Sequence, residues 1–493
     1  MPSSKLRIPY DSPLFIIFAV VTAVWYSNSA GFHTFPRLTH HGEDALGSYI
    51  GQEHPHLRRT FTTGRCLVLR SRDVLLDPPT PMISQELEIQ ILGWTRTPFA
   101  ISGGGHALNP GFSSTTGIHV SMSGFDTLEW HKDENTIDIG AGLRWDHVFD
   151  YLNPEGYTVV GGRVRGVGVA GFILGGGLSF KTNQLGLTID TLKSCEVVLP
   201  NGTFVRASHD ENPDLFFGLK GGFNNFGIVT KFTLGVYPQT DIWGGTVILA
   251  EKDIGGAHDA VVKFADTVTD PKATLNIIYE YAEGELNAIV ILFYDAPSPP
   301  PGLFDELLSI PNGKVTAASM SFATLLSAGQ PRNTPRRIQD VAPVQKYTPK
   351  LLDSIANETK HWGSFLEKNH SGHFFDYVVE VFLPTYYSHG TESAWPPSRD
   401  PASVHYPVNI AFAWYEKAHD QAVWDALKAS VAKLRADAEA EGQRIENAEL
   451  YPNLVIEGTP LERMYGKNLP RLRALRDVYD PERVMDLTGG WRF

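Results

Sequence analysis

Glycine is concentrated in three short stretches of this chain, and one of them ends in a histidine. The stretches are Ile101–His106, Gly161–Gly177 and Gly218–Gly227. Runs of glycine cost backbone entropy and supply no side-chain packing. They persist where the backbone needs a positive φ or lies close against a ligand, and free N–H groups in such loops can bind a pyrophosphate. The pattern favours a large phosphate-bearing cofactor over three plain surface turns.

The second stretch contains a GxGxxG pattern at Gly166, Gly168 and Gly171. This pattern is the fingerprint of dinucleotide binding only where a strand precedes it, a helix opens after it and an acidic residue follows about 20 positions on. Gly175–Gly177 should break any helix after Gly171, and no second strand leads to Asp190. We therefore expect no nicotinamide-binding Rossmann domain.

The chain offers no pattern typical of a metal site. Its two cysteines, Cys66 and Cys195, form no CxxC motif, so they predict either one bridge or two separate thiols. Four histidines gather near the N-terminus without carboxylates or cysteines at ligand spacing. These histidines, which we interpret as part of a surface loop, are His40, His41, His54 and His56.

Composition excludes several classes of protein. The 493 residues include 42 Lys and Arg against 55 Asp and Glu, a formal net charge of −13. An acidic chain is a poor partner for nucleic acid. With 42% apolar and 20% charged residues, the chain is too apolar for disorder and too polar for a multi-span membrane protein. Its length suits two or three domains.

The N-terminus has the pattern of a secretory signal peptide over residues 1–30. Lys5 and Arg7 precede an apolar run, Leu14–Tyr26, of 13 residues. This run is shorter than the roughly 20 residues that a membrane-spanning helix needs, and small residues before Ala30 suit a cleavage site. An uncleaved anchor and a buried helix are the alternatives. A secreted chain could carry N-linked sugars at its three sequons, Asn201, Asn357 and Asn369.

Short β-rich runs separated by glycine extend from Thr97 to about Pro238, which indicates a sheet-rich domain. Asn201-Gly202 is a tight hairpin signal between two such runs. Upstream, Pro55–Met82 shows no regular pattern. The strands expected in this part are Thr136–Gly140, Thr158–Val160, Glu196–Leu199 and Ile228–Leu234.

From about Trp243 to Glu449 the pattern mixes strands and helices. The clearest helix is Gln421–Glu441, in which Val423, Leu427, Val431 and Leu434 form one apolar stripe. The other expected helices are Ala257–Thr267, Lys350–Lys368 and, in the tail, Leu469–Val478. The expected strands are Gly245–Leu249, Leu275–Tyr281, Ala288–Tyr294, Asp376–Leu383 and Val408–Trp414.

Several motifs in order resemble one family. They are PFAISGGGH (Pro98–His106), IDIGAGLRWDHV (Ile137–Val148), VVGGRVRGVGVAGFILGGGLSF (Val159–Phe180), EVVLPNGT (Glu196–Thr203), NPDLFFGLKGGFNNFGIVTKFTL (Asn212–Leu234) and, in the tail, Tyr465–Met485. Together they resemble the berberine bridge enzyme-like oxidoreductases of the vanillyl alcohol oxidase superfamily. The resemblance implies an α+β fold, in which a PCMH-type FAD-binding domain of two α/β subdomains is joined to a substrate domain of antiparallel sheet flanked by helices. It also implies four segments: a signal peptide (1–30), the FAD-binding domain (31–242), the substrate-binding domain (243–449) and a C-terminal segment that returns to the FAD domain (450–493).

The resemblance places the cofactor FAD against the glycine stretches. His106 stands where the family links its histidine covalently to the flavin. Many relatives carry a second link through a cysteine, and this chain has Val164 at that position, so a single link is implied. Asn224 and Asn225 would lie near the adenine half. The expected cofactor-binding residues are Ser102, Gly103, Gly104, Gly105, His106, Gly166, Gly168, Gly171, Gly175, Gly176, Gly177, Gly227, Val229 and Asn468.

The expected catalytic base is Tyr451. Tyr451-Pro-Asn453 resembles the family's Y-x-N-Y motif, whose aromatic hydroxyls line the active site, although Leu454 occupies the second tyrosine position. A tyrosine has an ordinary pKa near ~10, so a basic phenol needs a cation or hydrogen bonds beside it. The other candidates are residues of the middle domain, namely Asp376, Glu380 and Tyr415.

The resemblance implies an oxidase that takes hydride from an alcohol or a similar C–H donor of a small natural product, with O2 as the second substrate. The family also contains carbohydrate oxidases, which usually carry the two-link flavin, and cyclases that template a ring closure. A flavin-binding protein without turnover is the alternative from another class. We expect no nucleic-acid partner and no stable membrane span.

Overall fold

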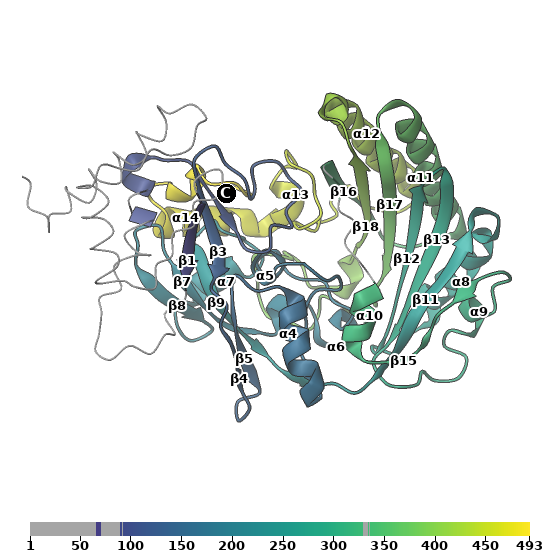
Figure 1. Ribbon diagram of the computed structural model, residues 1–493, viewed down its shortest axis with the longest axis horizontal. Coiled ribbons are helices and arrows are strands. Elements are labelled where there is room, and N and C mark those ends of the chain that lie inside the picture. Colours follow the sequence, from purple (N-terminus) through teal and green to yellow (C-terminus); the bar gives the residue numbers. More distant parts are fainter. Residues whose placement is uncertain (1–65, 71–88, 91, 329–333, 335) are drawn as a thin grey trace, which may run out of the picture.

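The computed structural model describes residues 66–70, 89–90, 92–328, 334 and 336–493 and arranges them in two lobes (Figure 1). The predicted signal peptide and the four N-terminal histidines lie outside the described residues. Glycosylation at the three sequons stays a prediction, and their asparagines are exposed. No helix among the described residues is long and apolar enough to cross a membrane.

A parallel sheet forms one part of the first lobe. Its strands lie in the order β1-β3-β2, and both β1 and β2 pair with β3 in parallel. Strand β1 falls within residues 55–82, where the sequence shows no regular pattern. The strands are β1 (Cys66–Arg70), β2 (Phe99–Ser102) and β3 (Ile118–Gly124).

An antiparallel sheet with the order β4-β5-β9-β7-β8 forms the other part of this lobe. The predicted hairpin is confirmed, because Gly202, at φ +84°, turns the chain between β7 and β8. The strands are β4 (Leu128–His131), β5 (Thr136–Gly140), β7 (Leu192–Val198), β8 (Phe204–Ser208) and β9 (Ile228–Gly235). The expected strand at Thr158–Val160 is shorter: β6 (Tyr157–Thr158) pairs with β10 (Tyr237–Pro238).

Helices connect the strands in the described part of the first lobe. Helix α5 opens after Gly168 and includes Gly171, and Gly175 ends it after six residues, so the glycine run breaks the helix as expected. The strand before it, β6, belongs to an antiparallel pair, so the Rossmann arrangement is still missing. The helices are α4 (Trp145–Leu152), α5 (Val169–Leu174), α6 (Thr182–Leu185) and α7 (Pro213–Leu219).

The second lobe is built on one large antiparallel sheet. The strand order is β14-β11-β13-β12-β17-β18-β16, and β15 also pairs with β11. The strands are β11 (Ile242–Ala250), β12 (Ala273–Ala282), β13 (Glu285–Tyr294), β14 (Lys314–Val315), β15 (Ala318–Met320), β16 (Arg336–Val344), β17 (Gly372–Val381) and β18 (Tyr406–Trp414). We did not predict β16, because it mixes charged residues with Pro343. It is an edge strand, where a proline is tolerated.

Helices cover the outer face of the large sheet, and its inner face is turned toward the first lobe (Figure 1). The stripe predicted on α12 is confirmed, since Val423, Leu427, Val431 and Leu434 are all buried in the core between the helices and the sheet. The helices of this lobe are α8 (Gly255–Thr267), α9 (Asp305–Leu308), α10 (Phe322–Ala328), α11 (Pro349–Asn369) and α12 (Asp420–Ala440).

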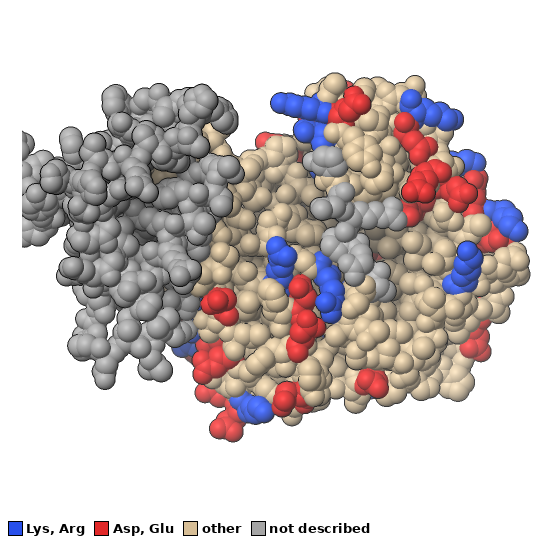
Figure 2. Space-filling view, in the orientation of Figure 1, with Lys and Arg blue, Asp and Glu red and all other residues tan. Residues whose placement is uncertain are grey.

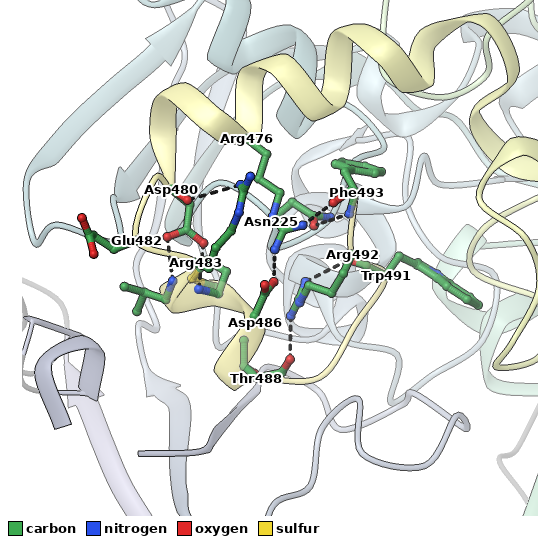
Figure 3. A network of polar contacts seen from close by, with 12 residues as sticks. Asn225, Arg476, Asp480, Glu482, Arg483, Asp486, Thr488, Trp491, Arg492 and Phe493 are labelled. Carbon is green, nitrogen blue, oxygen red and sulfur yellow. Dashed lines mark hydrogen bonds and ion pairs between the residues drawn. The ribbon is translucent and has the colours of Figure 1, made fainter. Parts of the chain in front are cut away.

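The last part of the chain lies on the first lobe, where it forms α13 (Glu462–Tyr465) and α14 (Leu469–Tyr479) (Figure 1). A polar network fastens the end of this segment (Figure 3). The buried carboxylate of Asp480 accepts hydrogen bonds from two backbone N–H groups, Arg476 pairs with Asp486, and Arg492 donates to Asn224. Asn224 and Asn225, expected near the adenine, thus also hold the chain's own end.

Acidic and basic side chains are interspersed on the visible face of the described part, which shows no basic stripe (Figure 2). This distribution agrees with the acidic composition, which disfavours polyanionic partners. Cys195 is a free, buried thiol, and burial raises its pKa far above the ordinary value. The thiol is therefore unreactive in the folded protein.

Candidate functional site

The first and second glycine stretches touch each other at the end of strand β2. A Cβ added to Gly104 would lie 2.4 Å from the Cα of Gly168, and one added to Gly168 would lie 2.4 Å from the nitrogen of Gly104. Only glycine allows this contact. The backbone N–H groups of Gly104 and Gly105 make no hydrogen bond within the described residues, and Gly105 has φ +66°. Free N–H groups in a left-handed turn fit the phosphates of FAD.

His106 ends the first glycine stretch, and its imidazole feels the charge of Arg337 from the second lobe. Its side chain is exposed, yet the surrounding protein lowers the pKa of the imidazole by partial desolvation. The charge of Arg337 on β16 lowers the pKa further and Arg144 adds to this, while a hydrogen bond to the histidine's own backbone opposes it. A neutral imidazole keeps the lone pair that a bond to a flavin carbon requires. The geometry therefore fits the link implied by the resemblance.

The middle of the second glycine stretch is fastened to helix α4. Cβ atoms added to Gly161 and Gly162 would lie 2.5 and 2.6 Å from the ring of Trp145. The N–H of Gly166 donates to Asp146 at 2.9 Å. These glycines let the loop lie flat on the helix, so part of the glycine excess serves packing of the protein itself.

The last glycines of this stretch accommodate side chains of the protein. A Cβ on Gly175 would lie 2.3 Å from the amide of Asn453, and one on Gly176 would lie 2.8 Å from the ring of Trp395. The N–H of Gly177 donates to the phenol of Tyr451 at 3.1 Å. These contacts place the glycine stretch directly beside the predicted base, and contact of the three glycines with FAD stays a prediction.

Alanine should be tolerated at one glycine of this stretch and not at another. Gly177 has φ +84°, and a Cβ there would lie 2.4 Å from the hydroxyl of Thr188. We expect Gly177→Ala to lower the free energy of unfolding by about 2 kcal/mol or more. Gly171 is helical, and a Cβ there would meet nothing within 4 Å, so Gly171→Ala should raise it by up to ~1 kcal/mol. Denaturant unfolding of both variants tests this, and equal shifts would contradict it.

Tyr451 is buried, and its phenol oxygen accepts two hydrogen bonds. The donors are the N–H of Gly177 at 3.1 Å and the amide of Asn453 at 3.0 Å. Burial raises the pKa of Tyr451, while these hydrogen bonds and the charge of Arg163 oppose the increase. Donors directed at a phenol oxygen stabilise the phenolate, so the geometry is compatible with a base. Leu454 only packs against the core.

The inner face of the large sheet carries polar side chains toward the first lobe. Asp376 and Glu380 lie on β17 with their side chains on this face, since the alternate residues of β17 enter the core under the helices. Glu380 is 3% exposed, and its Oε1 lies 2.7 Å from Nη2 of Arg163. Asp376 lies 3.9 Å from Arg337. Glu380 and Tyr451 are both held by the second glycine stretch, since Arg163 pairs with Glu380 and Gly177 donates to Tyr451.

Tyr415, the third alternative base, is poorly placed. It follows the end of β18, is 51% exposed, and stacks on His373 with the ring centroids 4.9 Å apart. No interaction connects it to Tyr451 among the described residues. Of the three alternatives, Glu380 is therefore the best supported by position and burial.

A loop of the second lobe packs against the first lobe close to Tyr451. This interlobe loop, residues 382–405, runs from β17 to β18 across the first lobe. The N–H of Trp395 donates to Lys220 O at 3.2 Å, and its indole donates to Leu450 O at 3.1 Å. Arg399 forms an ion pair of 2.7 Å with the buried Asp190. Nothing in the sequence pattern indicated this crossing.

The third glycine stretch holds the interlobe loop. The amine of Lys220 donates to Thr391 and to Glu392 O, and burial lowers the pKa of Lys220 to about 8. Asn468, expected near the cofactor, donates its amide to two carbonyls of the same loop. Gly227 lies against Val198 O, and Val229 lies on β9 opposite Val197. Contact of Asn468, Gly227 and Val229 with FAD stays a prediction.

Asp340 on β16 positions the segment that carries Tyr451. Its Oδ1 accepts from the N–H of Val341 at 2.8 Å and of Ile456 at 3.3 Å. Asp340 is 8% exposed, and this burial raises its pKa to about 6, against the two backbone hydrogen bonds. The charged carboxylate is thus disfavoured in the folded state.

This raised pKa predicts that Asp340→Asn changes the free energy of unfolding in a pH-dependent way. The amide oxygen can accept the same hydrogen bonds, and the variant carries no charge. The unfolded carboxyl titrates near ~3.9, so the wild type loses stability as the pH rises from about 4 to above 6. At pH 8 the variant should be more stable by on the order of 2–3 kcal/mol, and the advantage should vanish toward pH 4. A pH-independent difference in unfolding free energy would refute this.

The remaining predicted residues lie where the first glycine stretch begins. Ser102 ends β2, and a Cβ on Gly103 would lie 3.2 Å from Ala141 O. The sequence did not point to Arg163 or Trp395. The only signal for Arg163 was its position between Gly162 and the GxGxxG pattern, where a large charged side chain is unusual among glycines.

Comparison with known proteins gives a consistent result. Residues 87–208 match a family described as FAD binding domain. The chain is 30% identical over 408 residues to the FAD-dependent monooxygenase drtC of Aspergillus calidoustus, covering 80% of this chain and 77% of that protein. It is 37% identical over 273 residues to an uncharacterized FAD-linked oxidoreductase of Arthroderma benhamiae, covering 55% of this chain and 54% of that protein.

Solved structures show the same fold at low sequence identity. The carbohydrate oxidase from Microdochium nivale matches with a TM-score of 0.68 at 18% identity, over 95% of this chain and 97% of that one. Physcomitrella patens BBE-like 1 matches with a TM-score of 0.67 at 18% identity, over 85% of this chain and 89% of that one.

Proposed function

Because the chain belongs to the berberine bridge enzyme-like FAD-linked oxidoreductases, with FAD as cofactor, we propose that it oxidises an alcohol or a similar C–H donor of a small natural product. FAD supplies the hydride acceptor. One observation carries the proposal: the second glycine stretch contacts both candidate groups, since Arg163 pairs with the buried carboxylate of Glu380 and the N–H of Gly177 donates to the buried phenol of Tyr451.

Tyr451 and Glu380 have different proposed roles in the reaction. Tyr451, whose oxygen accepts two hydrogen bonds, would act as the phenolate, which takes the proton of the donor hydroxyl as hydride leaves the donor carbon for FAD. Glu380 on the inner face of the sheet accepts a hydrogen bond from the donor and orients it. The interlobe loop, with the buried Trp395, keeps water from this part of the site.

O2 is the proposed second substrate, and it allows two outcomes. As an oxidase, the enzyme releases one peroxide per oxidised donor, and no oxygen atom from O2 enters the product. The curated relative drtC is called a monooxygenase, and in that reaction one atom from O2 enters the product. Oxidation under 18O2, with peroxide and product mass both measured, separates the two.

A carbohydrate oxidase is the second candidate. The polar inner face of the sheet, with Asp376 and Glu380, suits a donor with several hydroxyl groups. Val164, 38% exposed at the position of the second flavin link in relatives, is the observation against it. An oligosaccharide donor should then reduce the flavin with a lower KM than a simple aromatic or aliphatic alcohol.

Anaerobic mixing of the holoenzyme with candidate donors tests the proposal. Loss of the flavin absorbance near ~450 nm reports hydride transfer from the donor. We expect bleaching with at least one hydroxylated natural product or sugar, and recovery with peroxide when O2 is admitted. Recovery only with an artificial acceptor would indicate a dehydrogenase, and no bleaching with any donor would favour a flavin-binding protein without turnover.

A further inference from the structure

Arg163 reaches from the first lobe to the large sheet of the second. Its backbone is fixed on both sides, by the contact of Gly161 and Gly162 with the ring of Trp145 and by the hydrogen bond from Gly166 to Asp146. The guanidinium therefore starts from a rigid point. It is 18% exposed, although arginine is rarely buried without a partner.

The guanidinium is held from several directions at once. Nη2 lies 2.7 Å from Oε1 of Glu380. The rings of Phe180 and Phe382 each lie 5.9 Å from the guanidinium carbon. With the amide of Asn276 oriented to satisfy both of its polar groups, its oxygen accepts from Nη1 at 3.2 Å. These contacts leave the side chain a single position between the lobes.

Glu380 is fixed by the same arrangement, yet one of its oxygens is free. Its backbone carbonyl accepts from the phenol of Tyr347 at 3.0 Å, and Arg163 holds Oε1. Oε2 is buried and has no hydrogen-bond partner among the described residues. Buried carboxylate oxygens are normally hydrogen-bonded, so this unpaired oxygen points to a partner that the described residues do not supply.

We propose that Arg163 is a positioning residue: it holds Glu380 by Oε1 so that Oε2 receives the hydroxyl of the donor. The inference rests on the proposed function. Arg163 also joins the lobes, because its loop belongs to the FAD side and Glu380 to the substrate sheet. A donor bound to Oε2 is thereby held at a fixed place relative to the loop that adjoins the flavin. The competing interpretation is a purely structural ion pair, which is common among buried pairs.

The test is a double-mutant cycle of Arg163→Gln and Glu380→Gln, read by anaerobic flavin reduction. If Arg163 acts through Glu380, Arg163→Gln should lower the limiting reduction rate about 10- to 100-fold. The double variant should then be no slower than Glu380→Gln alone. Arg163→Lys, which keeps the charge, should recover part of the rate. The matched control is Arg165→Gln, because Arg165 lies in the same loop and its ion pair among the described residues is with the exposed Asp150.

Two results would overturn the proposal. In the first, the double variant loses rate by the product of the two single losses, which would show that Arg163 acts independently of Glu380. The other is wild-type reduction rates in Arg163→Gln together with a lower unfolding temperature, which would show a structural pair. If no donor reduces the wild-type flavin, the proposed function itself fails. Coupling of the same cycle in thermal unfolding, which needs no donor, would then identify the pair as structural.

Discussion

Replacing His106 by alanine should release the flavin from the protein on acid precipitation, whereas the wild-type precipitate should stay yellow. A covalent link survives denaturation, and His106 is the histidine that follows the free amides of the first glycine loop. The lowered pKa of the imidazole keeps it neutral and able to form the bond. The link implied by the resemblance raises the flavin potential, so reduction by a given donor should also slow in His106→Ala.

The matched control is His209→Ala. His209 lies in the same lobe, is 85% exposed, and lies 3.4 Å from the exposed carboxylate of Asp210. This variant should keep its flavin in the precipitate. Retention of acid-stable flavin in His106→Ala, shown by a flavin-bearing peptide in a digest, would refute the assignment and direct attention to another residue.

Tyr451→Phe should lower the rate of flavin reduction by about 10² to 10⁴-fold, the usual contribution of a general base. The variant keeps the ring that packs on Trp395 at 4.8 Å and loses only the oxygen that accepts from Gly177 and Asn453. Binding of the donor should change much less than the rate. Stopped-flow reduction over a range of donor concentrations gives the two quantities separately.

Glu380→Gln should behave differently from Tyr451→Phe. It should weaken donor binding together with a smaller loss of rate, because Glu380 orients the donor. Tyr377→Phe is the control for loss of a buried phenol, because the hydroxyl of Tyr377 is hydrogen-bonded to that of Ser430 on the outer face of the sheet. A Tyr451→Phe variant within threefold of the wild-type rate would exclude the phenol, and a large rate loss in Glu380→Gln would then identify the carboxylate as the base.

The sequence predicted the parts of this protein that depend on local pattern. The apolar stripe of α12 and the strands of the large sheet are periodic, and period alone identifies them. The glycine stretches were also visible, because plain surface turns rarely need such dense runs of glycine. By contrast, β16 combines charged residues with a proline, and only its place at the sheet edge makes it a strand.

What could not be predicted depends on contacts distant in sequence. Gly175 and Gly176 are expected as cofactor contacts, and the sequence did not show that their backbone also lies against Asn453 and Trp395, more than 200 residues later. Asn468 likewise serves the interlobe loop. The partnership of Arg163 with Glu380 needs the topology of the sheet, which sets the face on which alternate residues of β17 project.

The interlobe loop has a consequence for how this protein is made. The first lobe is not a continuous stretch of chain, since its packing needs Trp395 and the segment from residue 450 onward. Domains usually fold as units during synthesis, the N-terminal one first. Here the first lobe cannot complete its packing until the interlobe loop and the segment from residue 450 onward have been synthesised. During that interval the surfaces that later meet Trp395 and α14 lack their partners, so synthesis in the presence of chaperones and of FAD should raise the yield of folded protein.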